Sequence, residues 1–246
     1  MKQRLLPGIL VLAAALTGCS ATSQSPDKLS GPGAHGTAAV HGAASAALES
    51  LPVKDRAPGS GYDRTERFGP AWSDTTTAPG SRNGCDARND ILARDLTQVT
   101  YQAGSACVIA SGRLSDPYTG TRIDFVRGPR SAAVQIDHVV ALSASWQTGA
   151  AELTQEQREA LANDPLNLLA SSGPANQHKS DSDAAGWLPA RTAFRCPYVA
   201  RQIAVKAKYG LWVTSAERDA MNRVLEHCPG QPLPGDRSAG VTLTPS

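Results

Sequence analysis

The sequence predicts an α+β domain, and three observations support this fold class. Two short runs rich in strand-forming residues, at 107–114 and 121–128, flank the turn sequence Asp116-Pro117-Tyr118-Thr119-Gly120, which is typical of a β-hairpin. Two later apolar runs, at 133–142 and 166–171, have the length of buried strands. Segments with apolar residues at helical spacing lie between and after these runs, so helices are expected around small sheets.

Several of the predicted helices carry signals for their ends. Thr154 is a candidate N-cap, Pro174 suits the first position of a helix, and Gly210 suits a helix end. Thr214 or Ser215 caps the last helix, with Glu217 in the capping-box position. The predicted helices are 85–96, one that starts near Ala144, 154–164, one that starts at Pro174, 196–210 and 214–228.

The two ends of the chain predict export and flexible flanks. Residues 1–18 combine two basic residues with a short apolar run, as in a secretory signal peptide. The sequence Leu16-Thr17-Gly18-Cys19 resembles a bacterial lipobox, which implies a lipid on Cys19 and a protein anchored to the membrane outside the cytoplasm, or released from it; the alternative is an ordinary signal peptide with a chance cysteine. Residues 19–61 and 229–246 predict a disordered tether and tail, which leaves one domain at 62–228.

The charge balance disfavours a protein that coats nucleic acid through bulk charge. The formal net charge is +2, and Lys2 and Arg4 of the predicted signal account for it. A near-neutral mature chain still permits a local basic cleft. Arg122, Arg127 and Arg130 cluster just before the apolar run at 133–142. We expect Arg127 and Arg130 to bind substrate; the alternative is that they form a solvated face.

Four cysteines remain once Cys19 is assigned to a lipid. In an exported chain they predict two disulfides, with three possible connectivities. We expect the local pairing, Cys85 with Cys107 and Cys196 with Cys228, each worth about 3 kcal/mol on the chain-entropy model. The absence of a C-x-x-C or C-x-x-H spacing in the sequence disfavours a zinc site.

Polar residues at three places in the domain suggest catalysis. Asp137 and His138 follow one predicted strand, Asn167 opens the next, and Asn176 and Lys179 lie on the helix after it. Histidine titrates near neutrality and can act as a base, and oxygen ligands favour Mg²⁺, Mn²⁺ or Ca²⁺. Because adjacent strand residues point to opposite faces, we expect the strand to end or distort at the Asp-His pair.

The order strand, loop, strand, helix with these residues resembles the ββα-metal (HNH, or His-Me finger) nuclease motif. The segments CDARNDILARDL and DPYTGTRIDFVRG, and the later Trp146 and Trp187-Leu188-Pro189, further resemble the exported HNH proteins of the DUF1524, or GmrSD C-terminal, group. The resemblance implies an α+β fold with a ββα-metal core and a metal-dependent endonuclease that cleaves nucleic acid, DNA being favoured.

The resemblance also implies a role for each matching residue. Asp137 and Asn176 hold a divalent metal, Mg²⁺ or Mn²⁺, and His138 takes a proton from the attacking water. Asn167 ties the loop between the strands. Separately from the resemblance, Lys179 lies three residues after Asn176 and shares its helix face, which leaves three roles open for it: contact with phosphate, pairing with Asp137, or a solvated lysine.

Other readings remain open at the level of the sequence. His178 replaces Asn176 as ligand if the helix begins later than expected. The main functional alternative is a catalytically inactive binding or structural lipoprotein on the same scaffold. The sequence contains no convincing carboxylate pair or zinc cluster of the kind that a peptidoglycan hydrolase needs. We expect the protein to be a monomer.

Overall fold

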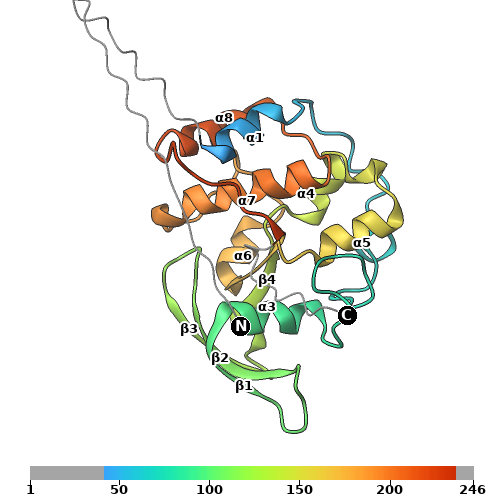
Figure 1. The fold of residues 1–246 in the computed structure, drawn as a ribbon, viewed down its shortest axis with the longest axis vertical. Coiled ribbons are helices and arrows are strands. Elements are labelled where there is room, and N and C mark those ends of the chain that lie inside the picture. Colours follow the sequence, from blue (N-terminus) through green and yellow to red (C-terminus); the bar gives the residue numbers. More distant parts are fainter. Residues whose placement is uncertain (1–41, 237–246) are drawn as a thin grey trace, which may run out of the picture. The chain divides into compact units, whose positions relative to one another are not determined.

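The computed structural model describes residues 42–236 (Figure 1). The predicted signal at 1–18, the lipidation site Cys19, the tether up to residue 41 and the tail from residue 237 lie outside these described residues. Within them the structure contains helices, two small sheets and two disulfides, which confirms a mixed α and β fold. In the part of the chain that is described, no helix is both long and apolar enough to cross a membrane.

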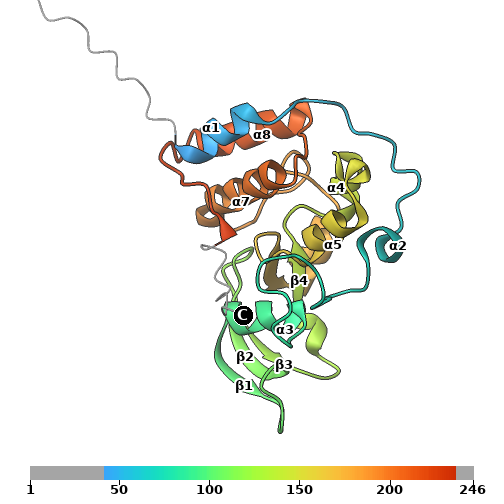
Figure 2. The ribbon, with the colours of Figure 1, turned by 45° about the vertical axis from the view of Figure 1, so that its right-hand side comes forward.

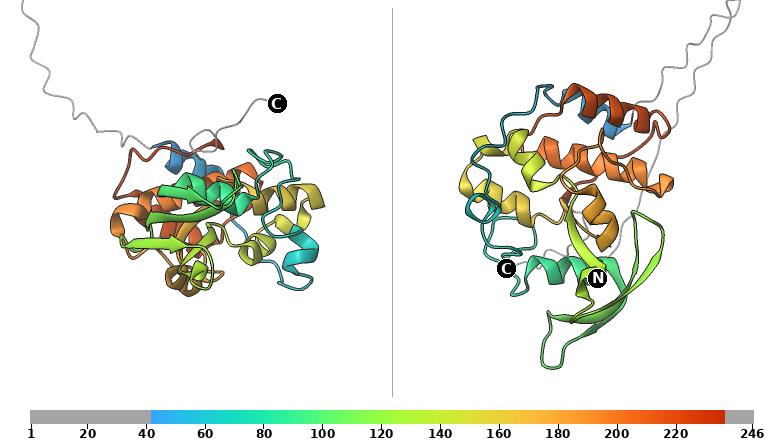
Figure 3. Two further views of the ribbon diagram at one scale, coloured as in Figure 1. Left: turned by 90° about the horizontal axis from the view of Figure 1, so that it is seen from below. Right: turned by 180° about the vertical axis from the view of Figure 1, so that it is seen from behind.

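The first sheet has three antiparallel strands, β1 (Leu96–Tyr101), β2 (Ile109–Ser115) and β3 (Arg122–Val126). Strands β2 and β3 form the predicted hairpin, whereas β1 was not predicted because its pattern is mostly exposed. Helix α3 (Ala87–Asp95) lies across this sheet (Figure 3) and buries Ile91 and Leu92. The Cys85–Cys107 disulfide joins the start of α3 to the turn before β2, as predicted.

The second sheet pairs β4 (Val134–His138) with β5 (Leu168–Ser172) in antiparallel register. The short 3₁₀ helix η1 (Ser131–Ala133) precedes β4, and β5 leads directly into α6 (Gly173–Lys179). Ile136 and Leu168 pack in one apolar cluster with α3, whereas Val139 and Leu169 pack in another with α7. The two faces of this small sheet therefore belong to different parts of the core.

The connection between β4 and β5 is helical. It contains α4 (Leu142–Gln147), η2 (Ala150–Glu152) and α5 (Gln155–Asn163). Thr154 caps α5, with Gln157 completing a capping box, so the predicted N-cap is confirmed. Trp146 of α4 packs against Phe68 of α2 (Arg64–Phe68), which brings the segment N-terminal to the first sheet against this connection.

Three helices form the remaining part of the core. Helix α7 (Arg195–Lys208) follows η3 (Thr192–Phe194) and contacts both α8 (Ser215–Leu225) and α1 (Ala43–Ser50). Figures 1 and 2 show α1 beside α8 with α7 beneath them. The predicted Cys196–Cys228 disulfide is present and joins the start of α7 to the end of α8.

Two sequence predictions about this region are wrong. Residues 42–61 are not a disordered tether, because Ala44, Leu48 and Leu51 are buried against α7 and α8. Residues 229–236 are likewise held, since Pro229 and Gln231 accept hydrogen bonds from the backbone of residues 42 and 44. Thr214 does cap α8, but the Glu217 side chain leaves the capping box and binds Lys206 instead.

Candidate active site

Asp137 lies at the centre of a buried charge cluster on one face of β4. Its Oδ1 accepts a hydrogen bond from Lys179 Nζ at 2.9 Å, and its Oδ2 accepts one from the Tyr118 hydroxyl at 2.5 Å. Lys179 is 0% exposed and Asp137 4% exposed. Burial raises the pKa of the Asp137 carboxyl, and the Lys179 ammonium and the Tyr118 hydroxyl offset part of this shift.

Local structure fixes each partner of Asp137. Tyr118 comes from the β2–β3 turn, where Asp116 accepts hydrogen bonds from Thr119 and, with its other oxygen, from the backbone N–H of Ser172. That last bond ties the turn to the end of β5. Lys179 is the final residue of α6, where a cation also suits the helix dipole. The cluster is therefore built from a turn, a strand end and a helix end.

His138 lies on the opposite face of the same strand. Its Nε2 is 2.8 Å from the Ala162 carbonyl oxygen, and its ring stacks on Trp72 with centroids 5.8 Å apart. His138 is 6% exposed and lines a cavity of about 10 Å³, together with Arg64, Trp72 and Asn163. Burial and then the charge of Arg64 lower the pKa of His138 to about 3.

The structure does not bring Asp137 and His138 into one site. Strand β4 ends at His138, as expected, but both residues remain paired across the ladder, with Leu169 and Leu168 respectively. Adjacent residues of a paired strand point to opposite faces, and no bulge interrupts this pair. Lys179 contacts both residues, because its Nζ also donates to the His138 carbonyl at 2.9 Å.

The other residues predicted for the site, Asn167, Asn176 and His178, each form side-chain hydrogen bonds within the domain. Asn167 is fully buried; its Oδ1 accepts from Val140 N, and its Nδ2 donates to the Val140 and Leu161 carbonyls, so it ties the end of β4 to the start of β5. Asn176 Nδ2 donates to Gln135 Oε1 on the Asp137 face of β4. His178 lies away from this face and accepts a hydrogen bond from the Trp187 indole.

These positions do not fit a metal held by Asp137 and Asn176. Both Asp137 oxygens already accept hydrogen bonds, and one of the donors is an ammonium group. A divalent cation beside the buried Lys179 would be strongly repelled. The described residues also contain no group of three His, Cys, Asp or Glu side chains placed to hold a metal ion. We therefore derive no catalytic step through a metal.

The two arginines predicted to bind substrate differ. Arg127 uses its guanidinium within the domain, because Nε donates to the Ile109 carbonyl and a terminal nitrogen donates to Asn89 Oδ1, each at 2.6 Å. Arg130 is exposed at the turn before η1. Of these two arginines, Arg130 is therefore the one whose side chain is exposed to solvent.

Four residues near Asp137 and His138 were missed as site residues. Tyr118 was assigned to a turn, and Arg64 and Trp72 precede the first predicted helix with no periodic pattern. Asn163 was assigned to a helix end; it is 3% exposed, and its Oδ1 has no hydrogen-bond partner among the described residues. The only sequence signal for any of them is the resemblance around DPYTG.

The comparison with protein families resolves the chain's kinship. Residues 86–224 match the model of the C-terminal domain of GmrSD restriction endonucleases. This chain belongs to that family. The GmrSD C-terminal match includes Tyr118, the Asp137-His138 pair, Asn167 and Lys179, and it begins after Trp72.

A fungal relative supports the same assignment. It is an uncharacterized secreted protein of Arthroderma benhamiae, 37% identical over 183 residues. The similarity covers 74% of this chain and 82% of the fungal protein. The resemblance to the GmrSD C-terminal group that the sequence suggested is thus confirmed. The similar fungal protein is described as secreted.

Proposed function

We propose that this protein is an endonuclease that hydrolyses phosphodiester bonds in nucleic acid, with DNA as the favoured substrate. The observation that carries the proposal is the match of more than half of the chain to a restriction-endonuclease domain. The succession β4, β5, α6, with Asp137-His138 at the end of the first strand and Asn167 at the start of the second, supports a ββα-type core.

His138 is the general base in this proposal. A carbonyl oxygen only accepts, so the bond to Ala162 assigns the ring proton to Nε2 and leaves the lone pair on Nδ1. The lowered pKa of His138 keeps the ring neutral near pH 7. A neutral imidazole with a free Nδ1 can take a proton from a water that attacks phosphorus.

This proposal also requires that a phosphodiester can reach His138 and that a positive charge lies near its phosphate. The cavity at His138 holds about 10 Å³, which is close to the space of one water, so a phosphodiester reaches this histidine only when side chains that line the cavity, among them Trp72, move aside. Arg64 lines the same cavity from α2 and supplies a positive charge for the phosphate. A bound phosphate would also raise the pKa of His138 towards the range of an efficient base.

Asp137 and Lys179 act as positioning residues in this proposal. Lys179 Nζ joins the Asp137 carboxylate to the His138 carbonyl, so the cluster holds the backbone of the base. The requirement for Mg²⁺ or Mn²⁺ stays a prediction that the assay below tests directly.

The location follows from separate observations. Disulfides persist in oxidising compartments, this chain has two, and its fungal relative bears the description secreted. We therefore propose that the protein lies outside the cytoplasm. Its monomeric state and the lipid anchor at Cys19 stay predictions.

A second candidate is a binding protein without catalysis. The buried Asp137–Lys179 pair and the cover of Trp72 over His138 favour it, because neither group is open to a substrate in the described arrangement. This candidate predicts ligand binding without turnover.

The deciding experiment is a cleavage assay on plasmid DNA and on an RNA transcript, with Mg²⁺, Mn²⁺ or EDTA. We expect wild-type protein to cleave and His138→Ala to be slower by about 10²-fold or more, with both proteins folded by circular dichroism. His35→Ala, outside the described residues, is the matched control and should cleave like wild type. Intact substrate with wild type under every condition, or equal cleavage by His138→Ala, would reject His138-dependent hydrolysis.

A further inference from the structure

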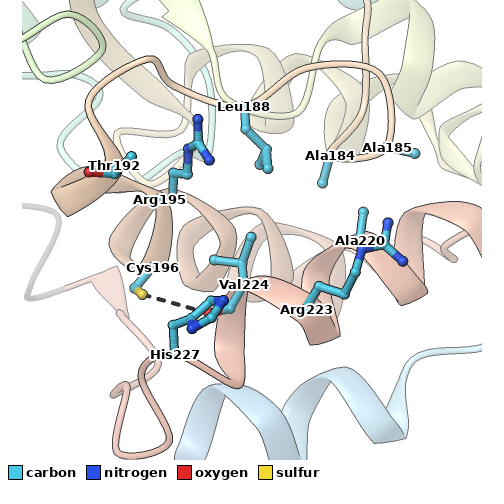
Figure 4. Close-up of a pocket in the computed structure, with 10 residues that line it drawn as sticks. All are labelled: Ala184, Ala185, Leu188, Thr192, Arg195, Cys196, Ala220, Arg223, Val224 and His227. Atoms are coloured by element: carbon cyan, nitrogen blue, oxygen red, sulfur yellow. Dashed lines mark hydrogen bonds between the residues drawn. The ribbon is translucent and has the colours of Figure 1, made fainter.

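A concave surface separate from the cavity at His138 lies between the loop that follows α6 and the helices α7 and α8. It has a volume of about 520 Å³ and is formed by residues 184–192 of this loop, α7 and α8 (Figure 4). Its floor is apolar, with Leu188 from the loop and Ala220 and Val224 from α8. A cavity of this size falls in the range that holds small ligands or a few units of a polymer. We call it the α7–α8 groove.

Positive charge is concentrated in the α7–α8 groove. Arg195 and Arg223 line it together with His227, and no Asp or Glu is among its lining residues. Neither arginine forms an ion pair with a described carboxylate: Arg195 Nε donates to the Pro189 carbonyl, which leaves its two terminal nitrogens for a ligand. Figure 4 shows the two guanidinium groups rising from different helices on either side of the apolar floor.

The Cys196–Cys228 disulfide holds this arrangement in place. Arg195 precedes Cys196 and His227 precedes Cys228, so the bridge fixes the backbone beside both of these lining residues. A covalent constraint of this kind lowers the entropy that a bound ligand would otherwise have to offset.

A short path joins the groove to the candidate active site. Trp187, next to Leu188, donates its indole N–H to His178 on α6 and packs edge-to-face on Tyr118, with ring centroids 5.0 Å apart. Tyr118 in turn binds Asp137. Two consecutive residues of one loop thus face the α6 region and the groove.

We propose that the α7–α8 groove binds a single strand of nucleic acid, with phosphates on Arg195 and Arg223 and a base against the floor. Guanidinium forks match phosphate oxygens in pairs, and the aliphatic side chains of the floor offer apolar surface that a base can cover and remove from water. Arg195 and Arg223 thus bring two positive charges, without a described carboxylate partner, to one concave surface. The inference rests on the proposed function, since the groove serves as a second contact for that substrate.

The test measures binding without cleavage. A fluorescein-labelled 20-nucleotide single strand of DNA is titrated with His138→Ala protein between 50 and 200 mM salt, and anisotropy is recorded. The test protein adds Arg195→Gln and Arg223→Gln. The control protein adds Arg82→Gln and Arg218→Gln, which remove the same charge from residues outside the groove and outside the arginine cluster at 122–130.

We expect the groove variant to bind at least tenfold more weakly at 50 mM salt, and its slope of log affinity against log salt to fall by about 1.4, the loss of two phosphate contacts. Arg223→Gln alone, at an exposed position that the fold does not need, should lower the slope by about 0.7. The control variant should keep the wild-type slope to within about 0.3.

The outcomes separate this inference from the nuclease proposal. Equal losses in the groove and control variants, or no binding by the parent protein at 50 mM salt, would overturn the groove. Arginine-dependent binding by a wild-type protein that never cleaves would uphold the groove and reject the nuclease. Cleavage by wild-type protein, together with binding that does not change when the two arginines are replaced, would uphold the nuclease and reject the groove.

Discussion

Replacing Lys179 with methionine tests whether Asp137 is held as a buried anion. Lys179→Met keeps the length of the side chain but removes the ammonium group that donates to Asp137 Oδ1 and to the His138 carbonyl. Asp137 then retains only Tyr118 as a side-chain donor. Breaking a buried ion pair in this way costs about 3–5 kcal/mol of the free energy of unfolding, a large part of the total for a single domain.

The loss should depend on pH with a defined sign. Burial already raises the pKa of Asp137, and Lys179 opposes that shift, so Lys179→Met raises the pKa further. A carboxyl whose folded pKa exceeds its unfolded pKa stabilises most below the unfolded value, and the stability falls as the pH rises through the folded value. The deficit relative to wild type should therefore shrink between pH 8 and pH 5.

The measurement is urea denaturation followed by circular dichroism at pH 5, 6.5 and 8. The double variant Lys179→Met/Asp137→Asn should recover most of the loss, because it leaves no uncompensated charge and keeps an acceptor for Tyr118. Lys54→Met, an exposed lysine that only lies over the Trp212 ring, should cost less than about 1 kcal/mol. A deficit for Lys179→Met below about 1 kcal/mol that does not change with pH would refute the buried anion and reopen Asp137 as a cation ligand.

Two further predictions concern the cover of His138 and the start of α6. Trp72→Ala should raise the pKa of His138 from about 3 towards its ordinary value, because burial is the main cause of the shift; NMR titration of the ring measures it, and cleavage should accelerate, whereas an unchanged pKa would show that Trp72 does not seal the site. Gly173→Ala should destabilise the domain by about 1–3 kcal/mol, because a Cβ there would collide with the Ala132 carbonyl oxygen. Gly230→Ala, which meets nothing within 4 Å, is the control for the same denaturation measurement, and equal stability of the two variants would contradict the close approach at Gly173.

Short-range signals explain most of what the sequence predicts correctly. The β2–β3 hairpin follows from its turn sequence, and the α5 start follows from its N-cap Thr154, because each of these structures is determined by contacts within a few residues. The two disulfides were also predicted, since both close short loops. Helix α1 falls in the segment predicted to be a tether, because that segment has few large apolar residues and is ordered by packing against α7 and α8.

The candidate site was only partly predictable for a related reason. Asp137 and His138 are adjacent in the sequence, but the strand sends them to opposite faces, and the pairing with β5 that enforces this is a long-range property. Their partners Tyr118 and Lys179 are 19 and 42 residues from Asp137. Only the packed fold decides that Lys179 meets the carboxylate, one of the three roles that the sequence left open for it.

The packing of α1 changes what counts as the minimal piece of this protein. The family match begins at residue 86, yet Ala44 and Leu48 fill the core between α7 and α8, and Gly42 and Ala44 hydrogen-bond to the backbone at 229–231. A recombinant fragment cut at the family boundaries would expose this apolar face to water and lose the cover of His138 as well. Expression of the autonomous folding unit therefore requires residues from at least 42 to 236, which is 56 residues more than the family match at 86–224 covers.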